Sequence, residues 1–484
     1  MKFLKKSKDE LYTGMRMDWR DSQRLFKREA ANRKRMRRFG GLVILLLMIW
    51  GLARFAGIAL YASDYDFSKN APEDQVAEDV ISPAGNDCPP EKSDLLAKRD
   101  LPVKKEVLNK RVLQASIADE RFTNLKDQSF DTALGGKSVR VETSLDLPLQ
   151  QFLVDQVSDS ISQNTGIVVL EPATGRILAM VSFDKRHTGK NPCVDNSFPA
   201  ASVFKIVTAG AAIETCGFDP NKELTFNGPK WTLYKTQITD RVTRYTNRIS
   251  FKDSFAQSIN PVFGKIGSLR LGSRVLTQYA TAFGFNHRIN FELELSPSEI
   301  SVENDPFRLA EIASGYNRDT TLSPVHGALI AAAILNQGGM PEPSIVDRVL
   351  DQRGAVLYEN HPSSLGKAIG SGACHTVYQL MEGTVLSGTG KKAFRGFEKD
   401  RVLSKLRIGG KTGSMDNRAR DARIDWFVGF AEEKNGTGAL AFAVVVAHEK
   451  LIGTRAGQYA RMAIEHYFRN HISTLRATQA DAKG

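Results

Sequence analysis

Three short motifs in this 484-residue chain hold side chains that can carry out nucleophilic chemistry. They are SVFK at residues 202–205, SIN at 258–260 and KTG at 411–413. A serine hydroxyl is a poor nucleophile until a base takes its proton, and a lysine whose pKa is lowered by burial or by a nearby cation can be that base. Each motif alone is weak evidence, but the three in this order are typical of a serine acyl-transfer site.

The first motif lies at the start of a predicted helix. Pro199 ends an extended loop, apolar residues then follow at helical spacing, and Gly217 marks the end of the helix. A spacing of three residues places Lys205 on the same face as Ser202, about one turn away. The alternative is an ordinary helix with a serine near its start and a solvent-exposed lysine. We expect alanine variants at both positions to fold, on the premise that neither side chain fills core volume.

The second motif is predicted to lie on a turn between two helices. Ser250 and Asp253 resemble a capping box that opens one helix, and Asn260 followed by Pro261 resembles the N-cap and first residue of the next. Such a turn can direct the hydroxyl of Ser258 and the amide of Asn260 to one point. The alternative is that both residues only cap helices.

The third motif ends a predicted strand that begins at Leu406. An edge strand would let an extended peptide pair with its backbone, with Gly413 leaving room for the approach. Lys411 and Thr412 supply a positive charge and a hydrogen-bond donor for a carboxylate. A phosphate-binding loop is excluded, because Lys405 stands where that motif needs a glycine and no helix follows.

The elements that must position these motifs predict an α+β fold. Strands are expected at both ends of the main domain, with mostly helical patterns between Gly175 and Leu406. The sheet is predicted to be antiparallel, with about five strands flanked by helices and a helical subdomain. The expected elements are strands at 139–143, 166–170, 176–181, 406–410, 426–430 and 439–447, with helices at 149–161 and 457–469.

The charge of the chain is concentrated at its N-terminus. Residues 1–38 contain 14 Lys/Arg and 5 Asp/Glu, and so account for most of the formal net charge of +12. An apolar stretch at 39–62 follows, which is long enough to cross a bilayer, and the basic cluster before it should stay in the cytoplasm. This pattern predicts a retained membrane anchor in preference to a cleaved signal peptide, and it argues against a nucleic-acid partner.

The remaining composition limits the chemistry further. The four cysteines are too few for a disulfide scaffold, although Cys193 and Cys216 flank the first motif and are a candidate bridge in an oxidising compartment. The eight histidines show no paired metal spacing, so neither a metal nor another cofactor is expected. His448, on an apolar strand, and Trp426 are expected to be packing residues.

The segment from about 139 to 470 resembles the transpeptidase domain of penicillin-binding proteins, whose signature is this set of three motifs. Further matching stretches lie at 143–150, 166–182, 323–339, 388–390 and 425–430. The resemblance implies a transpeptidase/β-lactamase-like fold and a monofunctional, class B-like form, because residues 63–137 are too short for a glycosyltransferase domain. Glu292 only weakly resembles the loop glutamate of class A β-lactamases.

The resemblance implies a role for each motif residue. Ser202 would be the nucleophile acylated by a D-Ala-D-Ala stem peptide, Lys205 its base, Ser258 the proton relay to the leaving D-Ala, and Asn260 the residue that orients Lys205 and the substrate. Lys411, Thr412 and Gly413 would bind the terminal carboxylate, and the backbone N–H groups of Ser202 and Ser414 would form the oxyanion hole. A second stem peptide would accept the acyl group, and β-lactams would acylate Ser202.

The predicted organisation follows from these patterns. It comprises a basic cytoplasmic tail (1–38), a transmembrane anchor (39–62), a periplasmic linker or short juxtamembrane region (63–137), the transpeptidase domain (138–470) and a C-terminal tail (471–484). The expected location is the cell membrane, crossed once, with the catalytic domain on the periplasmic or extracellular side. Glycan synthesis would need a separate polymerising protein.

Two other function classes remain open at this stage. In the first, the same acyl-enzyme is released to water, as in a D,D-carboxypeptidase or a β-lactamase; against a class D β-lactamase stands Asn260, where that class typically has an apolar residue. In the second, the site is idle and the protein is a cell-wall scaffold or a penicillin sensor.

Overall fold

A computed structural model describes residues 108–187, 191–417 and 419–481 of the chain. The predicted tail at 1–38, the predicted anchor at 39–62 and the linker up to residue 107 lie outside these residues. Within the described ranges, no helix combines the length and the apolar character needed to cross a bilayer.

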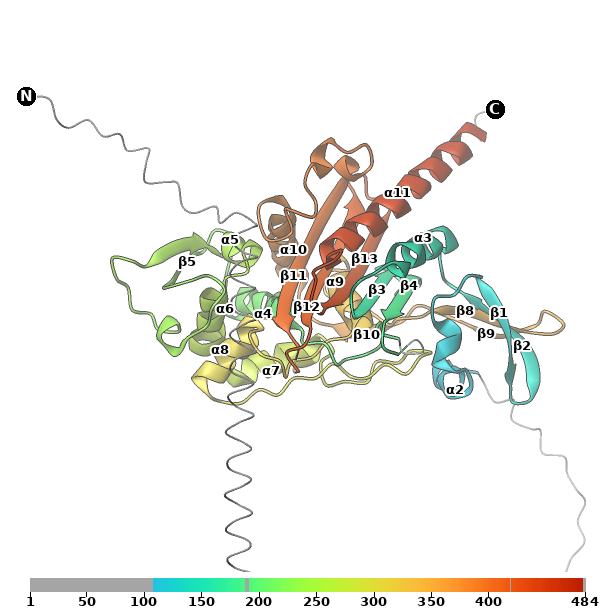
Figure 1. The fold of residues 1–484 in the computed structure, drawn as a ribbon, viewed down its shortest axis with the longest axis horizontal. Helices are drawn as coiled ribbons and strands as arrows, with labels where there is room; N and C mark the ends of the chain where they lie inside the picture. The colour runs from blue at the N-terminus through green and yellow to red at the C-terminus, as the bar shows by residue number, and fades with distance from the viewer. Residues whose placement is uncertain (1–107, 188–190, 418, 482–484) are drawn as a thin grey trace, which may run out of the picture. The chain divides into compact units, whose positions relative to one another are not determined.

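A five-stranded antiparallel sheet forms the centre of the fold (Figure 1), as predicted. Its strands come from both ends of the domain, and its order is β11 (Leu406–Asp416), β12 (Arg423–Glu433), β13 (Ala439–His448), β3 (Asn164–Leu170) and β4 (Ile177–Asp184). β13 pairs with β3, for example Val445 with Gly166, and so joins the two halves. β11 is an edge strand, and it continues three residues past the KTG motif, which the sequence prediction placed at its end.

Both faces of this sheet are buried, which explains why its strands are apolar at nearly every position. Val168 and Val428 point into the core shared with helix α9 (Pro324–Leu335). Ile167 and Val444 point to the opposite side, against α3 (Leu147–Ser158) and α11 (Ala456–Asp481). The helix that precedes β3 and the helix that follows β13 therefore cover the same face of the sheet.

Helices surround one end of the edge strand, and α10 (Ser371–Leu386) packs along it. The others in this group are α4 (Lys205–Cys216), α5 (Phe251–Ala256), α6 (Asn260–Ile266), the π-helical turn η6 (Gly267–Leu271), α7 (Gly272–Ala282) and α8 (Pro306–Ser314). The expectation of mostly helical structure holds here, but two features depart from it. A hairpin of β5 (Glu223–Phe226) and β6 (Asn247–Ser250) extends from this group, and residues 283–305 contain no helix or strand.

A second sheet lies at the other end of the central sheet, with the order β1 (Ser129–Leu134), β2 (Lys137–Thr143), β8 (Val346–Asp351) and β9 (Val356–Glu359). The β1–β2 hairpin spans residue 138, the predicted domain boundary. Helix α2 (Lys110–Ser116) attaches nearby, where the Lys110 Nζ donates to Glu342 Oε1 at 2.8 Å. The short elements are η3 (Asp119–Phe122), η4 (Ala201–Phe204), η5 (Lys235–Gln237), η7 (Phe397–Lys399), η8 (Leu403–Lys405) and the pair β7 (Gly339–Pro341) and β10 (Ser364–Lys367).

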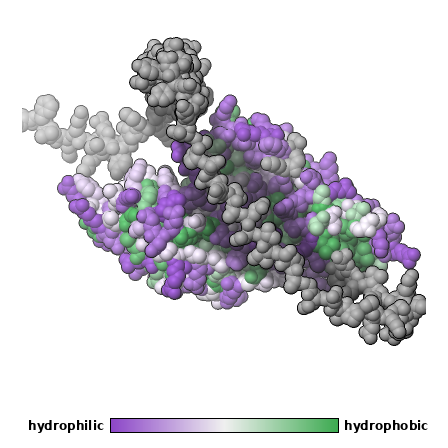
Figure 2. All heavy atoms as spheres, turned by 90° about the horizontal axis from the view of Figure 1, so that it is seen from below, coloured by the Kyte–Doolittle hydropathy of each residue, from purple (hydrophilic) through white to green (hydrophobic). Residues whose placement is uncertain are grey.

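The face of the molecule in Figure 2 is mostly hydrophilic, with smaller hydrophobic patches among the described residues. This is the usual surface of a folded domain in contact with water.

The candidate disulfide is wrong, because Cys193 and Cys216 are both free thiols. The Sγ of Cys193 is buried and directed at the carbonyl oxygen of Val181, 3.2 Å away. Cys216 lies at the last residue of α4, so a helix of 12 residues separates it from the Ser202 turn. At 1.5 Å per residue this is roughly 18 Å, which leaves Cys216 far from the start of that helix.

Candidate active site

Ser202 lies in the 3₁₀ turn η4 that leads into α4, close to the predicted helix start. Its side chain is partly exposed, while the residues on both sides of it are buried. The turn is fixed from the flanking sheet, where the Trp426 indole N–H donates to the carbonyl of Pro199 at 2.8 Å. Ala201 is held at φ +49°, a strained value for a residue with a side chain. The core packing of Trp426 was expected, but its role in supporting the nucleophile turn was not.

Gly315 allows another element to reach the same turn. It ends α8 in the left-handed conformation at φ +64°, and a Cβ at this position would lie 1.8 Å from the carbonyl oxygen of Ala201. Only glycine permits this approach. The consequence is that the carbonyl of Ser314, at the end of α8, reaches the Lys205 side chain.

Lys205 is fully buried, and its Nζ has three partners. They are Ser202 Oγ at 2.7 Å, Asn260 Oδ1 at 2.8 Å and the Ser314 carbonyl at 2.5 Å. A carbonyl oxygen and an amide oxygen can only accept hydrogen bonds. In the neutral amine, the two N–H bonds are therefore committed to Asn260 and Ser314, and the lone pair is left facing the Ser202 hydroxyl.

The electrostatics of the site favour that neutral amine. Burial lowers the pKa of Lys205 well below its ordinary value, and the charge of Lys411 lowers it further. Burial also lowers the pKa of Lys411, to about 7. Each side-chain nitrogen lies over a phenylalanine ring, with Lys205 Nζ 5.5 Å from the centre of Phe263 and Lys411 Nζ 5.5 Å from that of Phe255. The loss of water around the two buried nitrogens is what favours loss of a proton.

Ser258 and Asn260 lie on the predicted turn, between α5 and α6. Ser258 has φ +56° and accepts a hydrogen bond from Lys411 Nζ at 2.9 Å. The predicted N-cap role of Asn260 is wrong, since Ile259 occupies the cap position and Asn260 is the first helical residue. The Asn260 amide is held at both ends, because its Oδ1 accepts from Lys205 and its Nδ2 donates to the Trp231 carbonyl at 3.1 Å.

The KTG motif lies on the edge strand beside this turn. Thr412 is partly exposed, and its Oγ1 lies 2.5 Å from the Oγ1 of Thr389. Gly413 also lies close to the Ser202 turn. A Cβ there would lie 3.2 Å from Val203 Cγ2 and 3.2 Å from Trp426 Cβ, so the lack of a side chain lets the strand pack closely against this turn. The exposed Ser414 accepts a hydrogen bond on its Oγ from Arg423 Nε at 3.0 Å.

The structure therefore connects five of the motif side chains in two hydrogen-bonded groups. Ser202, Lys205 and Asn260 form the first, and Ser258 and Lys411 form the second. The charge of Lys411 acts on Lys205, which couples the groups. Among the residues that the structure describes, no group of three or more His, Cys, Asp or Glu side chains could hold a metal ion.

The weaker candidates have other partners. Glu292 is buried and accepts from Ser344 Oγ at 2.6 Å and from the Ile345 N–H at 3.2 Å, so it supports the 344–345 backbone. His448 is buried on β13, with Nε2 3.8 Å from Asp425. In the described part of the chain, neither forms a hydrogen bond or an ion pair with a residue of the three motifs.

Besides the supporting roles of Trp426 and Gly315, three contributors to the hydrogen bonds of the site were not found from the sequence. Two of them, at Ser314 and Trp231, act through a backbone carbonyl, which leaves no side-chain signature. The third, Thr389, lies in the 388–390 stretch that had been noted only as part of the family resemblance. Its Oγ1 also donates to the Ala256 carbonyl at 3.3 Å, which links Thr412 to the end of α5.

Comparisons with known proteins found similar sequences and folds. Residues 165–467 match the family described as penicillin binding protein transpeptidase domain. The peptidoglycan D,D-transpeptidase PbpA of Mycolicibacterium smegmatis is 24% identical over 378 residues, which cover 70% of this chain and 73% of that protein.

Solved structures share the fold. Penicillin-binding protein A from M. tuberculosis, as an imipenem acyl-enzyme complex, has a TM-score of 0.56 at 22% identity, covering 68% of this chain and 79% of that one. The D,D-transpeptidase domain of a peptidoglycan glycosyltransferase from Eggerthella lenta has a TM-score of 0.57 at 20% identity, covering 77% and 93%.

Proposed function

The chain belongs to the penicillin-binding protein transpeptidase family, and from this premise we propose that it cross-links peptidoglycan through an acyl-enzyme on Ser202. The protein is a serine-type D-Ala-D-Ala transpeptidase that binds penicillin. The proposal adds the residues that carry the reaction, the course of the reaction and the place of the protein in the cell.

One observation carries the assignment of Ser202 and Lys205. The two acceptor-only partners of Lys205 leave its lone pair facing Ser202 Oγ at 2.7 Å. A base within hydrogen-bond reach of a nucleophile, with a lowered pKa and an orienting partner, is the arrangement that nucleophilic catalysis requires. An ordinary solvated lysine near a helix start, the alternative considered from sequence, does not have this environment.

The remaining motif residues complete the reaction. Lys205 takes the Ser202 proton as Oγ attacks the carbonyl between the two D-Ala residues. The N–H groups of Ser202 and Ser414 stabilise the oxyanion, and each such donor typically contributes about 3 kcal/mol. Ser258 passes the proton to the leaving amine, while Lys411 and Thr412 bind the carboxylate of the leaving D-Ala. The amine of a second stem peptide then attacks the ester and restores Ser202.

We further propose that residues 39–62 anchor the protein in the cell membrane, with the catalytic domain on the periplasmic or extracellular side. The support is the apolar stretch itself and the basic cluster that precedes it. In this setting the partner is a separate protein that polymerises glycan strands, and the substrates are the stem peptides of those strands.

Intact-protein mass spectrometry after a brief exposure to benzylpenicillin tests the acyl-enzyme. We expect the protein to gain the mass of one penicillin and to keep it, because the antibiotic acylates Ser202 and water releases it slowly. A rapid return to the free mass would instead indicate a β-lactamase, and no gain would indicate an idle scaffold. Incubation with labelled stem peptides should then give cross-linked dimers, whereas trimmed monomers alone would indicate a carboxypeptidase.

The rate of acylation by benzylpenicillin should depend on pH through the two lysines, with opposite signs. Lys205 must be neutral to accept a proton, so the rate rises as pH rises through its lowered pKa. Lys411 must be charged to attract the carboxylate, so the rate falls as pH rises above about 7. Stopped-flow acylation across the pH range should therefore give a bell-shaped profile.

The Lys411→Ala variant shows which lysine is responsible for each limb of this pH profile. It removes the cation that lowers the Lys205 pKa, so the acidic limb should move to higher pH, and the alkaline limb should disappear. An acidic limb that stays in place would show that Lys411 does not act on the base.

A further inference from the structure

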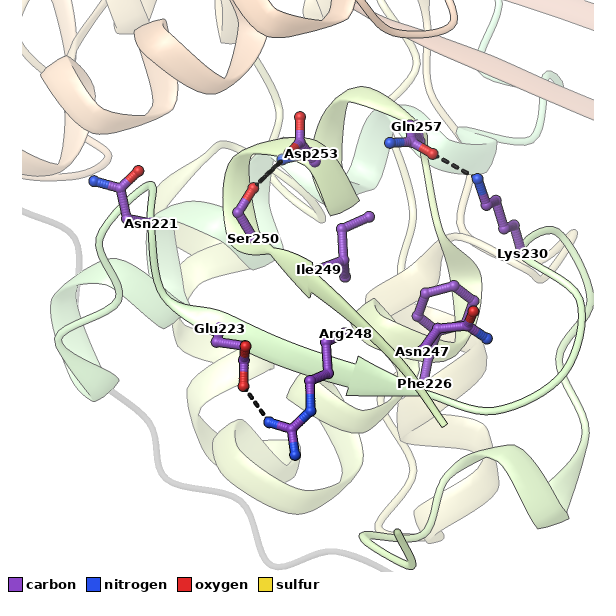
Figure 3. A pocket seen from close by; sticks show the side chains of 10 residues that line it. All are labelled: Asn221, Glu223, Phe226, Lys230, Asn247, Arg248, Ile249, Ser250, Asp253 and Gln257. Carbon is purple, nitrogen blue, oxygen red and sulfur yellow. Dashed lines mark hydrogen bonds and ion pairs between the residues drawn. The ribbon is translucent and has the colours of Figure 1, made fainter. Parts of the chain in front are cut away.

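A cavity of about 580 Å³ lies between the β5–β6 hairpin and helix α5 (Figure 3). Its lining is rich in side chains that bind peptides: the amides of Asn221, Asn247 and Gln257, and the charged groups of Glu223, Lys230 and Arg248. Arg248 and Glu223 face each other across the hairpin as an ion pair, and both are more than half exposed. The catalytic steps above use none of these side chains.

The cavity shares its wall with the catalytic turn. Gln257 lines the cavity and directly precedes Ser258 in the chain. Lys230 Nζ donates to Gln257 Oε1 at 2.7 Å, and the Lys230 carbonyl accepts from the Asn260 N–H at 2.8 Å. The indole N–H of Trp231, whose side chain is 66% exposed, donates to the Gln257 carbonyl at 3.1 Å. The same short backbone segments therefore form one side of the cavity and hold Ser258 and Asn260.

The second half of the reaction, in which an amine takes the acyl group from Ser202, requires a second substrate on the Ser258 side of the site. The incoming amine forms a bond to the acyl carbon as the bond from that carbon to Ser202 Oγ breaks, and the proton of the amine is transferred to Ser202 Oγ. By microscopic reversibility, the amine must arrive where the leaving D-Ala amine departed, which is beside Ser258. The donor peptide already occupies the edge of β11, so the second stem peptide has to approach from the side on which Ser258 lies.

We propose that this cavity binds the acceptor stem peptide, an amide-rich peptide that carries a free amine and carboxylates. The inference rests on the proposed transpeptidase function and adds the position of its second substrate. The amide side chains match a peptide backbone, and the charges of both signs match an amine beside a carboxylate. The exposed Trp231 is tied to the backbone of Gln257, the residue that joins the cavity to Ser258. The hairpin then determines which acceptor the enzyme uses.

The test separates the two half-reactions in the full-length protein. A synthetic thioester donor ending in D-alanine acylates Ser202, and a synthetic stem peptide with a diamino acid is added as the acceptor. The ratio of peptide transfer to hydrolysis is followed as the acceptor concentration rises. We expect Arg248→Ala to raise the acceptor concentration for half-maximal transfer about tenfold, as the loss of a charged hydrogen bond predicts, with an unchanged rate of penicillin acylation.

Two further variants sharpen the result. Asn247→Ala, also in the cavity, should change acceptor dependence in the same direction. Arg270→Ala is the matched control, because Arg270 is an exposed arginine that lines a different cavity beside β5, and it should leave both half-reactions unchanged.

The outcomes distinguish this inference from the function on which it rests. If the wild-type protein transfers the acyl group and both cavity variants keep its acceptor dependence, the inference is wrong and the transpeptidase function stands. An equal loss of penicillin acylation in Arg248→Ala would also overturn it, since the residue would then act on the first half-reaction. If the wild-type protein is acylated but transfers nothing to the peptide, the proposed function itself fails.

Discussion

Replacing Ser202 with alanine is expected to abolish covalent labelling of the protein by a fluorescent penicillin. Among the described residues, Lys205 forms a hydrogen bond to one hydroxyl, that of Ser202, so this is the oxygen on which we expect the ester to form. In other serine enzymes, removal of the nucleophile lowers the rate on the order of 10⁶-fold. Gel fluorescence after incubation with the labelled penicillin measures the effect directly.

This variant should fold normally. The Ser202 side chain is partly exposed and makes one hydrogen bond among the contacts described, so its loss should cost about 1 kcal/mol at most. Thermal unfolding of the variant provides the control. Robust labelling of a folded Ser202→Ala protein, with the adduct mapped to Ser258 or elsewhere, would overturn the assignment of the nucleophile.

Removing the base, Lys205, is expected to give the second large effect on penicillin acylation. Lys205→Ala should slow penicillin acylation by about 10²- to 10⁴-fold, the usual contribution of a general base. The structure corrects the expectation that this variant folds without cost. Lys205 is among the largest fully buried side chains, so alanine would leave a cavity and two unpaired acceptors, Asn260 Oδ1 and the Ser314 carbonyl.

Two variants of similar size separate catalysis from packing. Lys205→Met keeps most of the buried volume but has no basic nitrogen, and Lys205→Arg keeps the charge but cannot lose its proton. Both should be as slow as Lys205→Ala when acylation is measured by stopped-flow fluorescence. Acylation at the wild-type rate in Lys205→Arg would show that a fixed positive charge, and no base, is all that the position supplies.

The sequence predicted the side chains of the site better than the structure around them. Ser202, Lys205, Ser258 and Lys411 could be found because they combine reactive groups with regular spacing near helix and strand signals. The carbonyl of Ser314 could not, because every residue has one and only the fold determines where it points. Its position depends on Gly315, whose sequence context marks a helix end and gives no indication of what lies against it.

The fold, like the site, has parts that could be predicted from the sequence and parts that could not. The central sheet could be predicted because its strands are long, apolar and bounded by turns. The pairing of β2 with β8 could not, because Arg140 and Leu350 are neighbours in the sheet but about two hundred residues apart in the chain. The Cys193–Cys216 bridge failed for a related reason, since proximity in sequence to the same motif did not place the thiols together.

The pairing of β13 with β3 has a consequence for how the enzyme becomes active. A growing polypeptide contains Ser202 and Ser258 long before it contains Lys411, and strand β3 keeps an exposed, apolar edge until the last strand is synthesised. Such late, non-local strand pairing makes folding slow and leaves incomplete chains prone to aggregate. The nucleophile is thus present early, yet reactivity toward a β-lactam arises only once β11, β12 and β13 are in place, so nascent chains that lack these strands should escape the antibiotic.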